Sequence, residues 1–260
     1  MPNKITRPTN YFPSITIYSR AKTGKTKFLT TAGQGKILIL DAQHGTDWMT
    51  HPKLQPDVWH IEKWSDWEDA YQFLRHEKHN YIWAGNDTLT KLHNLSLRMV
   101  INAEGDKPLP SGISLPKRGL AGEHVKMMID KFRRLPMGVI FTANERVITT
   151  KPDGDRSILD SEELDSAGLD ESNGDIRFVP DLPDDVRKHL VAETDIIGRL
   201  YVMPPSEMHP RGERRLWVAH HNDYDTGYRS QYQLPSYISG KNGASMGQLM
   251  AHLRKDTDNG

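Results

Sequence analysis

Short apolar runs alternate with amphipathic segments along much of this chain. Continuous apolar runs bounded by polar or glycine residues are typical of buried strands in a parallel sheet. Segments whose apolar residues recur every three or four positions predict helices that bury one face. The pattern predicts strands at 14–18, 36–41, 58–61, 81–84, 139–143, 196–203 and 215–220, and helices opening at 27 and covering 66–77, 88–103, 122–135, 184–191 and 245–253.

This alternation of strands and helices predicts an α/β fold with a mainly parallel central sheet flanked by helices. The chain has 260 residues, which is enough to bury a sizeable core. It shows no internal repeat and no linker that would divide two cores. We therefore expect a single domain over residues 1–260.

The segment 146–175 interrupts the pattern. It is rich in Asp, Glu, Ser and Gly and poor in large apolar side chains. Such a composition favours a long loop or a partly disordered segment over a packed element. We expect a mobile insertion at about 146–180.

Composition narrows the function classes. The chain contains no cysteine, which excludes disulfides and thiolate chemistry. Lys plus Arg and Asp plus Glu both total 34, so a nucleic-acid partner would need a local basic surface. No stretch is apolar enough to span a membrane, and the N-terminus lacks an apolar signal segment, so we expect a cytoplasmic protein without a membrane partner.

The strand at 14–18 leads into a loop that ends in Gly24-Lys25-Thr26, the ending of a phosphate-binding P-loop. Gly24 lets backbone N–H groups approach a phosphate, Lys25 places a charge on the β- and γ-phosphates, and Thr26 offers a hydroxyl to Mg²⁺. Ser19 stands where the pattern begins with glycine. A basic turn before a helix is the alternative. The predicted nucleotide-binding loop comprises Ser19, Arg20, Ala21, Lys22, Thr23, Gly24, Lys25 and Thr26.

Two acids follow predicted strands and are candidates to hold Mg²⁺. Asp41 ends the run Ile-Leu-Ile-Leu-Asp, and Asp87 follows the strand at 81–84. P-loop NTPases place an Asp at such a strand end. Either acid also suits a helix N-cap. We favour Asp87, together with Thr26, as the metal site.

Five segments, taken in order and spacing, resemble the phage core-only RecA/Rad51-type ATPases, which are RecA-like single-strand annealing and recombination proteins. These are the Gly-Lys-Thr loop, Leu-Asp-Ala-Gln-His-Gly at 40–45, Asn-Asp-Thr-Leu-Thr at 86–90, Phe-Thr-Ala-Asn-Glu at 141–145 and Ile-Gly-Arg-Leu at 197–200. The resemblance implies a RecA-like P-loop core that binds ATP, Mg²⁺ and single-stranded DNA. It also implies a ring or filament of identical subunits, annealing or strand pairing in phage homologous recombination, and a single-strand DNA-binding protein as a further partner.

The resemblance assigns water activation to a Glu that follows the second strand, and Gln43 stands there instead. A glutamine amide can orient a water but cannot take its proton. We therefore expect slow hydrolysis, or the use of another group, with Asp41 and His44 as nearby candidates. The alternative for His44 is a solvated turn residue.

Two further roles come from the resemblance alone. Asn144 lies where RecA-like proteins place a polar residue that senses the γ-phosphate, although the family usually has His there. Arg229 matches the Arg of a Lys-x-Arg pair that reaches a neighbour's ATP site, while Gly227 replaces the Lys. The alternatives are a polar strand end for Asn144 and a surface turn for Arg229.

The sequence gives only a weak indication of which residues would contact DNA. Basic clusters suit phosphate binding, but each also suits a solvated helix or hairpin face. The acidic centre of the insertion would repel phosphate, so its basic ends are the better candidates, with Arg146, Lys151, Arg156 and Arg177. Two functions remain open: a DNA-dependent ATPase that drives annealing, and a nucleotide-gated DNA-binding protein with little hydrolysis. A helicase-like motor is a third, weaker alternative. The clusters contain Lys117, Arg118, Lys126, Lys131, Arg133, Arg134, Arg211, Arg214 and Arg215.

Overall fold

The computed structural model describes residues 12–33, 35–51, 55–103, 109–150, 156–159, 175–207, 209–210, 212–230 and 233–253. Within these ranges the strands are β1 (Ser14–Ser19), β2 (Ile37–Asp41), β3 (Asp57–His60), β4 (Trp83–Asp87), β5 (Gly138–Thr150), β6 (Arg156–Leu159), β7 (Asp175–Pro180), β8 (Ile196–Met203), β9 (Glu213–Trp217), β10 (Gly227–Tyr228) and β11 (Tyr237–Ile238). The helices are α1 (Lys25–Thr30), α2 (Trp64–His76), α3 (Leu89–Val100), α4 (Leu115–Arg133), α6 (Asp184–Glu193) and α7 (Met246–Leu253).

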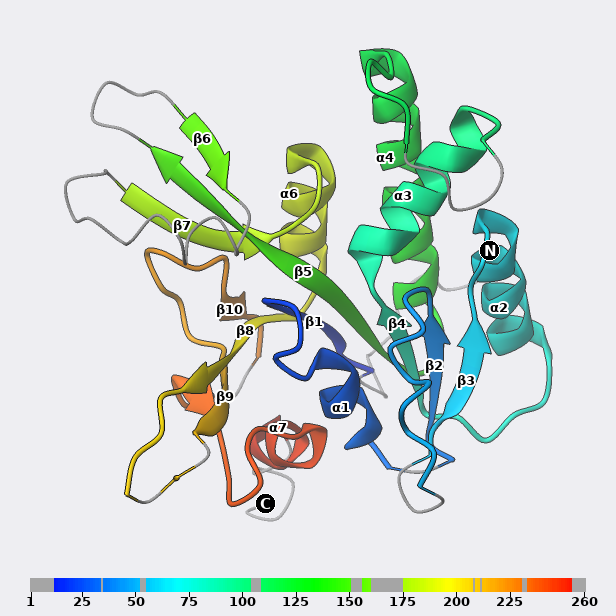
Figure 1. Cartoon of the computed structure of the whole chain (residues 1–260). Helices are drawn as coiled ribbons and strands as arrows, with labels where there is room; N and C mark the ends of the chain where they lie inside the picture. The colour runs from blue at the N-terminus through cyan, green and yellow to red at the C-terminus, as the bar shows by residue number, and fades with distance from the viewer. Residues whose placement is uncertain are drawn as a thin grey trace, which may run out of the picture.

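The strands join into one sheet in the order β11-β9-β8-β1-β5-β4-β2-β3 (Figure 1). The pairs from β8 through β1, β5, β4 and β2 to β3 are all parallel. The strands β9, β10 and β11 add antiparallel pairs at the β8 edge. The expected α/β fold with a mainly parallel sheet is confirmed.

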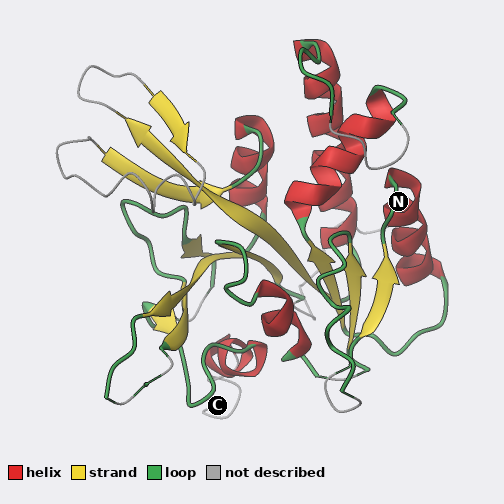
Figure 2. Ribbon diagram, viewed as in Figure 1, coloured by secondary structure: helices red, strands yellow, loops and turns green. Residues whose placement is uncertain are grey.

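Helices cover both faces of the sheet (Figure 2). On β2, Leu38 and Leu40 join the core that contains buried side chains of α2, α3, α4 and α6. Ile37 and Ile39 point to the opposite core, which contains buried side chains of α1 and α7. This alternation explains the continuous apolar run, because a strand buried on both faces needs apolar residues at every position.

Local hydrogen bonds fix where α2 and α3 begin. The Asp66 carboxylate accepts hydrogen bonds from the backbone N–H groups of Glu62 and Lys63, at 2.9 and 3.0 Å. Thr88 caps α3 through its hydroxyl, which accepts a hydrogen bond from the backbone of Lys91. Asp87 therefore does not cap this helix, and its carboxylate is available for other contacts.

The long helix α4 differs from its prediction because it begins at Leu115 rather than at Gly122. Pro116 lies in its first turn, where a missing N–H costs nothing. Glycines at 119 and 122 obscure the helical pattern in the sequence. None of the helices in the described ranges is long and apolar enough to cross a membrane.

The structure also differs from the expected loop after Arg146. Strand β5 continues to Thr150 and pairs antiparallel with β7 and β6, which forms an arm at the upper left of Figure 1. Buried Val147 and Thr149 alternate with the more exposed Arg146 and Ile148, as a strand requires. The acidic composition further along hid this short alternation. Residues 151–155 and 160–174 lie outside the described ranges, so the mobility of this insertion stays a prediction.

Candidate functional site

Lys25 is the first residue of α1, and its side chain reaches back to the start of the loop that joins β1 to this helix. Its side chain is buried, and its Nζ donates hydrogen bonds to the Ser19 carbonyl (3.1 Å), the Ser19 hydroxyl (3.3 Å) and the Arg20 carbonyl (3.3 Å). Burial lowers the pKa of Lys25. The ammonium group is thus held by neutral oxygen atoms inside the loop, where an anion would be a stronger partner.

Thr26 and Asp87 meet directly, as the sequence predicted for the metal site. The Thr26 hydroxyl donates a 2.6 Å hydrogen bond to Asp87 Oδ2, and Thr142 on β5 donates a 2.5 Å bond to Asp87 Oδ1. Asp87 is almost fully buried, and this burial raises its pKa. A Cβ added at Gly45 would lie 3.0 Å from Thr26 Oγ1, so the loop after β2 also closes on this point. The pair offers the oxygen ligands that Mg²⁺ prefers.

Asp41 has a different role from Asp87. Its Oδ1 accepts hydrogen bonds from the backbone of Gln43 (2.9 Å) and Gly45 (3.2 Å). Its Oδ2 accepts bonds from the backbone and the hydroxyl of Thr46, at 2.9 and 2.6 Å. Both oxygens are therefore used to shape the loop, which leaves Asp87 as the acid beside Thr26.

The loop shaped by Asp41 carries Gln43 and His44, and both side chains are exposed. His44 lies near acidic groups, with Nδ1 3.8 Å from Asp47 Oδ2 and Nε2 3.2 Å from Glu62 Oε1. Gln43 is two residues from Gly45, which abuts Thr26. The structure thus places the predicted water-positioning residue on a loop that borders the nucleotide site.

Asn144 is the last residue of β5 that pairs with β1, and it lies next to Ser19 in the sheet register. Its backbone N–H donates to the Thr90 hydroxyl (3.0 Å), and its carbonyl accepts from Asp181 (2.8 Å). The backbone is therefore fixed beside the first residue of the P-loop. The sensing role of its side chain stays a prediction.

Glu145 and Arg199 form a buried ion pair that was not among the predicted site residues. Arg199 donates two hydrogen bonds to the Glu145 carboxylate, at 2.6 and 3.1 Å, and Arg20 of the P-loop has its Nε 3.7 Å from the same carboxylate. The Arg199 guanidinium also lies over the rings of Phe178 (4.0 Å) and Tyr224 (4.5 Å). The sequence did mark these two residues, because Glu145 lies in the segment 141–145 and Arg199 in the segment 197–200, which both carry the family resemblance.

Arg229 is not brought together with Lys25 of the same chain. Its guanidinium donates to the carbonyl of Glu193 at 2.6 Å, and its backbone N–H donates to the carbonyl of Asp195 at 2.6 Å. Asp195 in turn contacts Ser14, the first residue of β1. Because the P-loop follows the last residue of β1, the two sites lie about 16 Å apart along the strand. A role for Arg229 in a neighbouring subunit stays a prediction.

Arg214 on β9 lies against the P-loop, although the sequence suggested only a DNA-contacting cluster. Its guanidinium occupies the space that a Cβ at Gly24 would need, and Gly24 has a φ of +104°. Arg214 Nε is buried and finds no hydrogen-bond partner among the described residues. Burial lowers the pKa of this guanidinium. Sequence spacing could not reveal this position, because it depends on how β9 folds back beside β8.

Comparisons with known proteins found a family model that covers most of the chain and two distant likenesses among solved structures. A family model described as "AAA domain" (AAA_24) matches residues 12–230. Among solved structures, an ATPase from the type III secretion system of pathogenic bacteria is 13% identical with a TM-score of 0.43; 73% of this chain and 52% of that chain are covered. The flagellar accessory protein FlaH from Methanocaldococcus jannaschii is 10% identical with a TM-score of 0.42, covering 87% and 83%.

Among curated proteins, none matches this sequence. The chain spans about half the length of the secretion-system ATPase. The family model, in contrast, covers most of this chain and includes the P-loop, Asp87 and the Glu145–Arg199 pair. This protein is therefore a P-loop NTPase domain and belongs to the AAA-domain family AAA_24.

Proposed function

We propose that this protein binds ATP with Mg²⁺ in the loop 19–26 and hydrolyses it slowly. The observation that carries this proposal is the position of Lys25, whose buried ammonium has three neutral oxygen partners and lies beside the Thr26–Asp87 pair. Burying a cation whose direct hydrogen-bond partners are all neutral is costly, and the nearby charges of Asp87 and Glu145 offset only part of that cost. The β- and γ-phosphates of ATP would supply that partner, as they do in other P-loops.

The oxygens of Thr26 and Asp87 fit a Mg²⁺ ion. The Thr26 hydroxyl would bind the metal directly, and Asp87 would hold it through a water. The ion would neutralise charge on the phosphates. Arg214 would add a second positive charge from the same chain, because its guanidinium faces Gly24.

Slow hydrolysis follows from the loop after β2. Asp41 is occupied by four hydrogen bonds from this loop, so it is poorly placed to take a proton. Gln43 can orient a water through its amide but offers no base. General-base assistance is worth roughly 10²–10⁴-fold, which is the expected deficit.

A calorimetric titration with MgATP tests the proposal. We compare the wild type with Lys25→Met, which keeps the apolar stem, and with Lys27→Met, a matched control at an exposed position of α1. The Lys25→Met variant should lose ATP binding, while Lys27→Met should bind as the wild type does. Equal ATP affinity in all three proteins would overturn the proposal.

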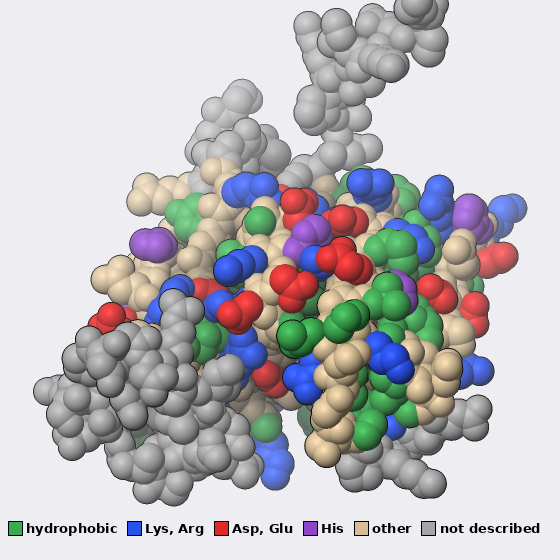
Figure 3. Space-filling model, turned by 90° about the horizontal axis from the view of Figure 1, so that it is seen from above, with side chains coloured by type: hydrophobic (Ala, Val, Ile, Leu, Met, Phe, Trp, Pro, Cys, Tyr) green, Lys and Arg blue, Asp and Glu red, His purple; other side chains and the backbone are tan. Residues whose placement is uncertain are grey.

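The finer proposal is that ATP binding controls a homo-oligomer that binds single-stranded DNA and promotes annealing in phage recombination. Support comes from the resemblance and from a chain of contacts that leads from Arg20 of the P-loop through Glu145 and Arg199 to Phe178 on β7. The charges around the proposed DNA-binding segment give this proposal less support. Arg146 and Arg177 are paired with Asp184 and Asp225, and the face in Figure 3 mixes acidic and basic side chains.

Binding of a labelled oligonucleotide separates the two functions left open by the sequence. Fluorescence anisotropy with and without a non-hydrolysable ATP analogue measures nucleotide-gated binding, and single-turnover hydrolysis with and without the oligonucleotide measures DNA-dependent ATPase activity. If the ATP analogue raises the affinity for the oligonucleotide but the oligonucleotide does not raise the rate of hydrolysis, the protein is a nucleotide-gated DNA-binding protein. No DNA affinity under either condition would overturn the DNA proposal while leaving the ATP proposal intact.

A further inference from the structure

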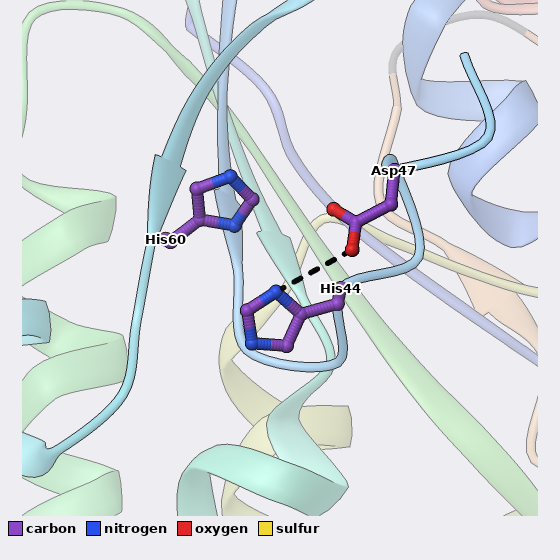
Figure 4. A group of neighbouring side chains, drawn as sticks. All are labelled: His44, Asp47 and His60. Atoms are coloured by element: carbon purple, nitrogen blue, oxygen red, sulfur yellow. Dashed lines mark ion pairs between the residues drawn. The ribbon is translucent and has the colours of Figure 1, made fainter. Parts of the chain in front are cut away.

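Two histidines and one aspartate gather outside the nucleotide site. His44 and Asp47 lie in the loop after β2, and His60 ends β3 (Figure 4). One potential ligand atom from each residue lies within 4.8 Å of the other two. The two imidazole rings stack with centroids 5.1 Å apart. All three side chains are exposed, so an ion from solvent can reach them.

Backbone hydrogen bonds fix both segments that carry this cluster, the loop after β2 and the end of β3. Asp41 binds three backbone N–H groups of the loop, and this fixes the turn that carries His44 and Asp47. His60 is paired with Asp41 in the parallel register of β2 and β3. His44 itself has a φ of +56°, in the left-handed region that residues other than glycine adopt at a cost. Strain of this kind concentrates at functional positions.

Glu62 gives His44 the outer partner that metal-binding histidines usually have. Its Oε1 lies 3.2 Å from His44 Nε2, while His44 Nδ1 faces Asp47 across 3.8 Å, the contact drawn as a dashed line in Figure 4. A ligating histidine commonly donates its second ring N–H to a carboxylate, which fixes the tautomer. Glu62 would therefore leave Nδ1 of His44 free to bind a metal.

We propose that His44, Asp47 and His60 bind a divalent transition-metal ion of the zinc class, with water completing the coordination. Two imidazoles and a carboxylate suit zinc, whereas Mg²⁺ prefers oxygen ligands alone. Ligand atoms around a tetrahedral zinc ion lie about 3.3 Å apart, given bonds of about 2.0–2.1 Å. Because the ligand atoms now lie within 4.8 Å of one another, the exposed side chains need to close by at most about 1.5 Å, which rotation of their side-chain torsions permits.

Metal binding would join the loop after β2 to β3. That loop also carries Gln43, and its Gly45 abuts Thr26 at the nucleotide site. An ion held by both segments would restrict movement of Gln43. The site thus offers a way for a second metal to hold the water-positioning loop in one arrangement, separately from Mg²⁺ at Thr26 and Asp87.

Competition with a chromophoric chelator tests the site on tag-free, full-length protein. Zn²⁺ is titrated in the presence of excess Mg²⁺, and Co²⁺ provides a visible spectrum of the bound ion. We expect one equivalent of Zn²⁺. His60→Asn and Asp47→Asn should weaken binding by roughly tenfold or more, and so should His44→Asn, which tolerates the positive φ. Glu62→Gln should weaken binding by about tenfold through its effect on His44.

His76→Asn is the matched control, because His76 is exposed on α2 and is not part of the cluster. It should bind Zn²⁺ as the wild type does. Thermal unfolding with EDTA checks that each variant is folded. Failure of the wild type to bind one equivalent would overturn the proposal. So would wild-type affinity in the His44, Asp47 and His60 variants, or an equal loss of affinity in His76→Asn.

Discussion

Glu145 and Arg199 face each other across the end of β1. Glu145 directly follows the last β5 residue that pairs with β1, Arg199 lies on β8, and β1 runs between these two strands. The pair makes two hydrogen bonds, at 2.6 and 3.1 Å, and the Glu145 side chain is only 1% exposed. It therefore ties together the two neighbours of β1 where the chain enters the P-loop.

Removing one partner of this pair should destabilise the protein strongly. Glu145→Gln leaves the Arg199 guanidinium buried without its carboxylate, which typically costs about 3–5 kcal/mol. Replacing both residues, as Glu145→Gln with Arg199→Met, should cost less than the sum of the single changes, because no unpaired charge remains. Urea unfolding of all four proteins measures the coupling. Strict additivity would show that the pair does not act as a unit.

Asp87 should release a proton when magnesium and nucleotide bind. Burial raises the pKa of Asp87, so the free folded protein keeps this proton to a higher pH than the unfolded chain does. Its contribution to folding stability is present at acidic pH and is lost as the pH rises through the raised pKa. A metal needs the ionised carboxylate, so MgATP affinity should fall as the pH is lowered through the same range.

Calorimetry in two buffers with different ionisation enthalpies checks this linkage at mildly acidic pH. The apparent binding enthalpy should depend on the buffer for the wild type. Asp87→Asn carries no titrating carboxyl and should lose the part of the proton release that comes from this residue. Identical enthalpies in both buffers for the wild type would contradict a raised pKa at Asp87.

Replacing Gln43 by Glu should raise the ATPase rate by at least about tenfold, because even part of the roughly 10²–10⁴-fold effect of a positioned base exceeds that. The side chain is exposed and its backbone is held by Asp41, so the change should leave the loop in place. Gln72→Glu, at an exposed position of α2, is the control for added negative charge. If turnover does not rise in Gln43→Glu while ATP affinity is unchanged, the water is activated elsewhere.

The sequence predicted the central sheet well because its strands are buried on both faces. A short, continuous apolar run such as 36–41 is typical of a strand buried on both faces of a parallel sheet. The arm formed by the end of β5 with β6 and β7 was missed, since its alternation is short and lies beside acidic residues. The start of α4 was missed because its first turns are exposed and two glycines interrupt its apolar pattern.

In the candidate site, the sequence predicted residues that belong to a recognisable motif or strand end. It did not predict side chains that reach the site from distant strands. Lys25 and Thr26 are adjacent in the chain, and Asp87 could be recognised because it follows a predicted strand. Arg214 offers no such signal, because its place beside Gly24 depends on the antiparallel return of β9. Partners that depend on topology cannot be deduced from spacing alone.

Arg229 should act in a neighbouring subunit if it acts on ATP at all. Within its own chain it binds the carbonyl of Glu193, at the end of the sheet away from Lys25. Lys25→Met and Arg229→Ala should each lower ATP turnover, and mixing the two variants should partly restore it, because mixed interfaces contain one intact copy of each residue. No recovery in confirmed mixed oligomers would assign Arg229 to holding the end of α6.

Arg214 should contribute to ATP binding from within the same chain. Its guanidinium faces Gly24, and its buried Nε has no partner among the described residues, so a phosphate oxygen would satisfy a group that is otherwise desolvated at a cost. A hydrogen bond to a charged group contributes about 1.5–3 kcal/mol, so Arg214→Gln should weaken MgATP binding by roughly tenfold or more. The fold should tolerate the change, because glutamine keeps a polar end at a position that is only half-buried.

Arg215→Gln is the matched control for this prediction. The neighbouring guanidinium points elsewhere, since Arg215 binds Glu213 at 2.6 Å and lies over the Tyr237 ring at 4.4 Å. Calorimetric titrations should therefore show wild-type ATP affinity for Arg215→Gln and a clear loss for Arg214→Gln. If the two variants bind ATP equally well, Arg214 only packs against the P-loop, and the phosphates are held by Lys25 and the loop backbone without it.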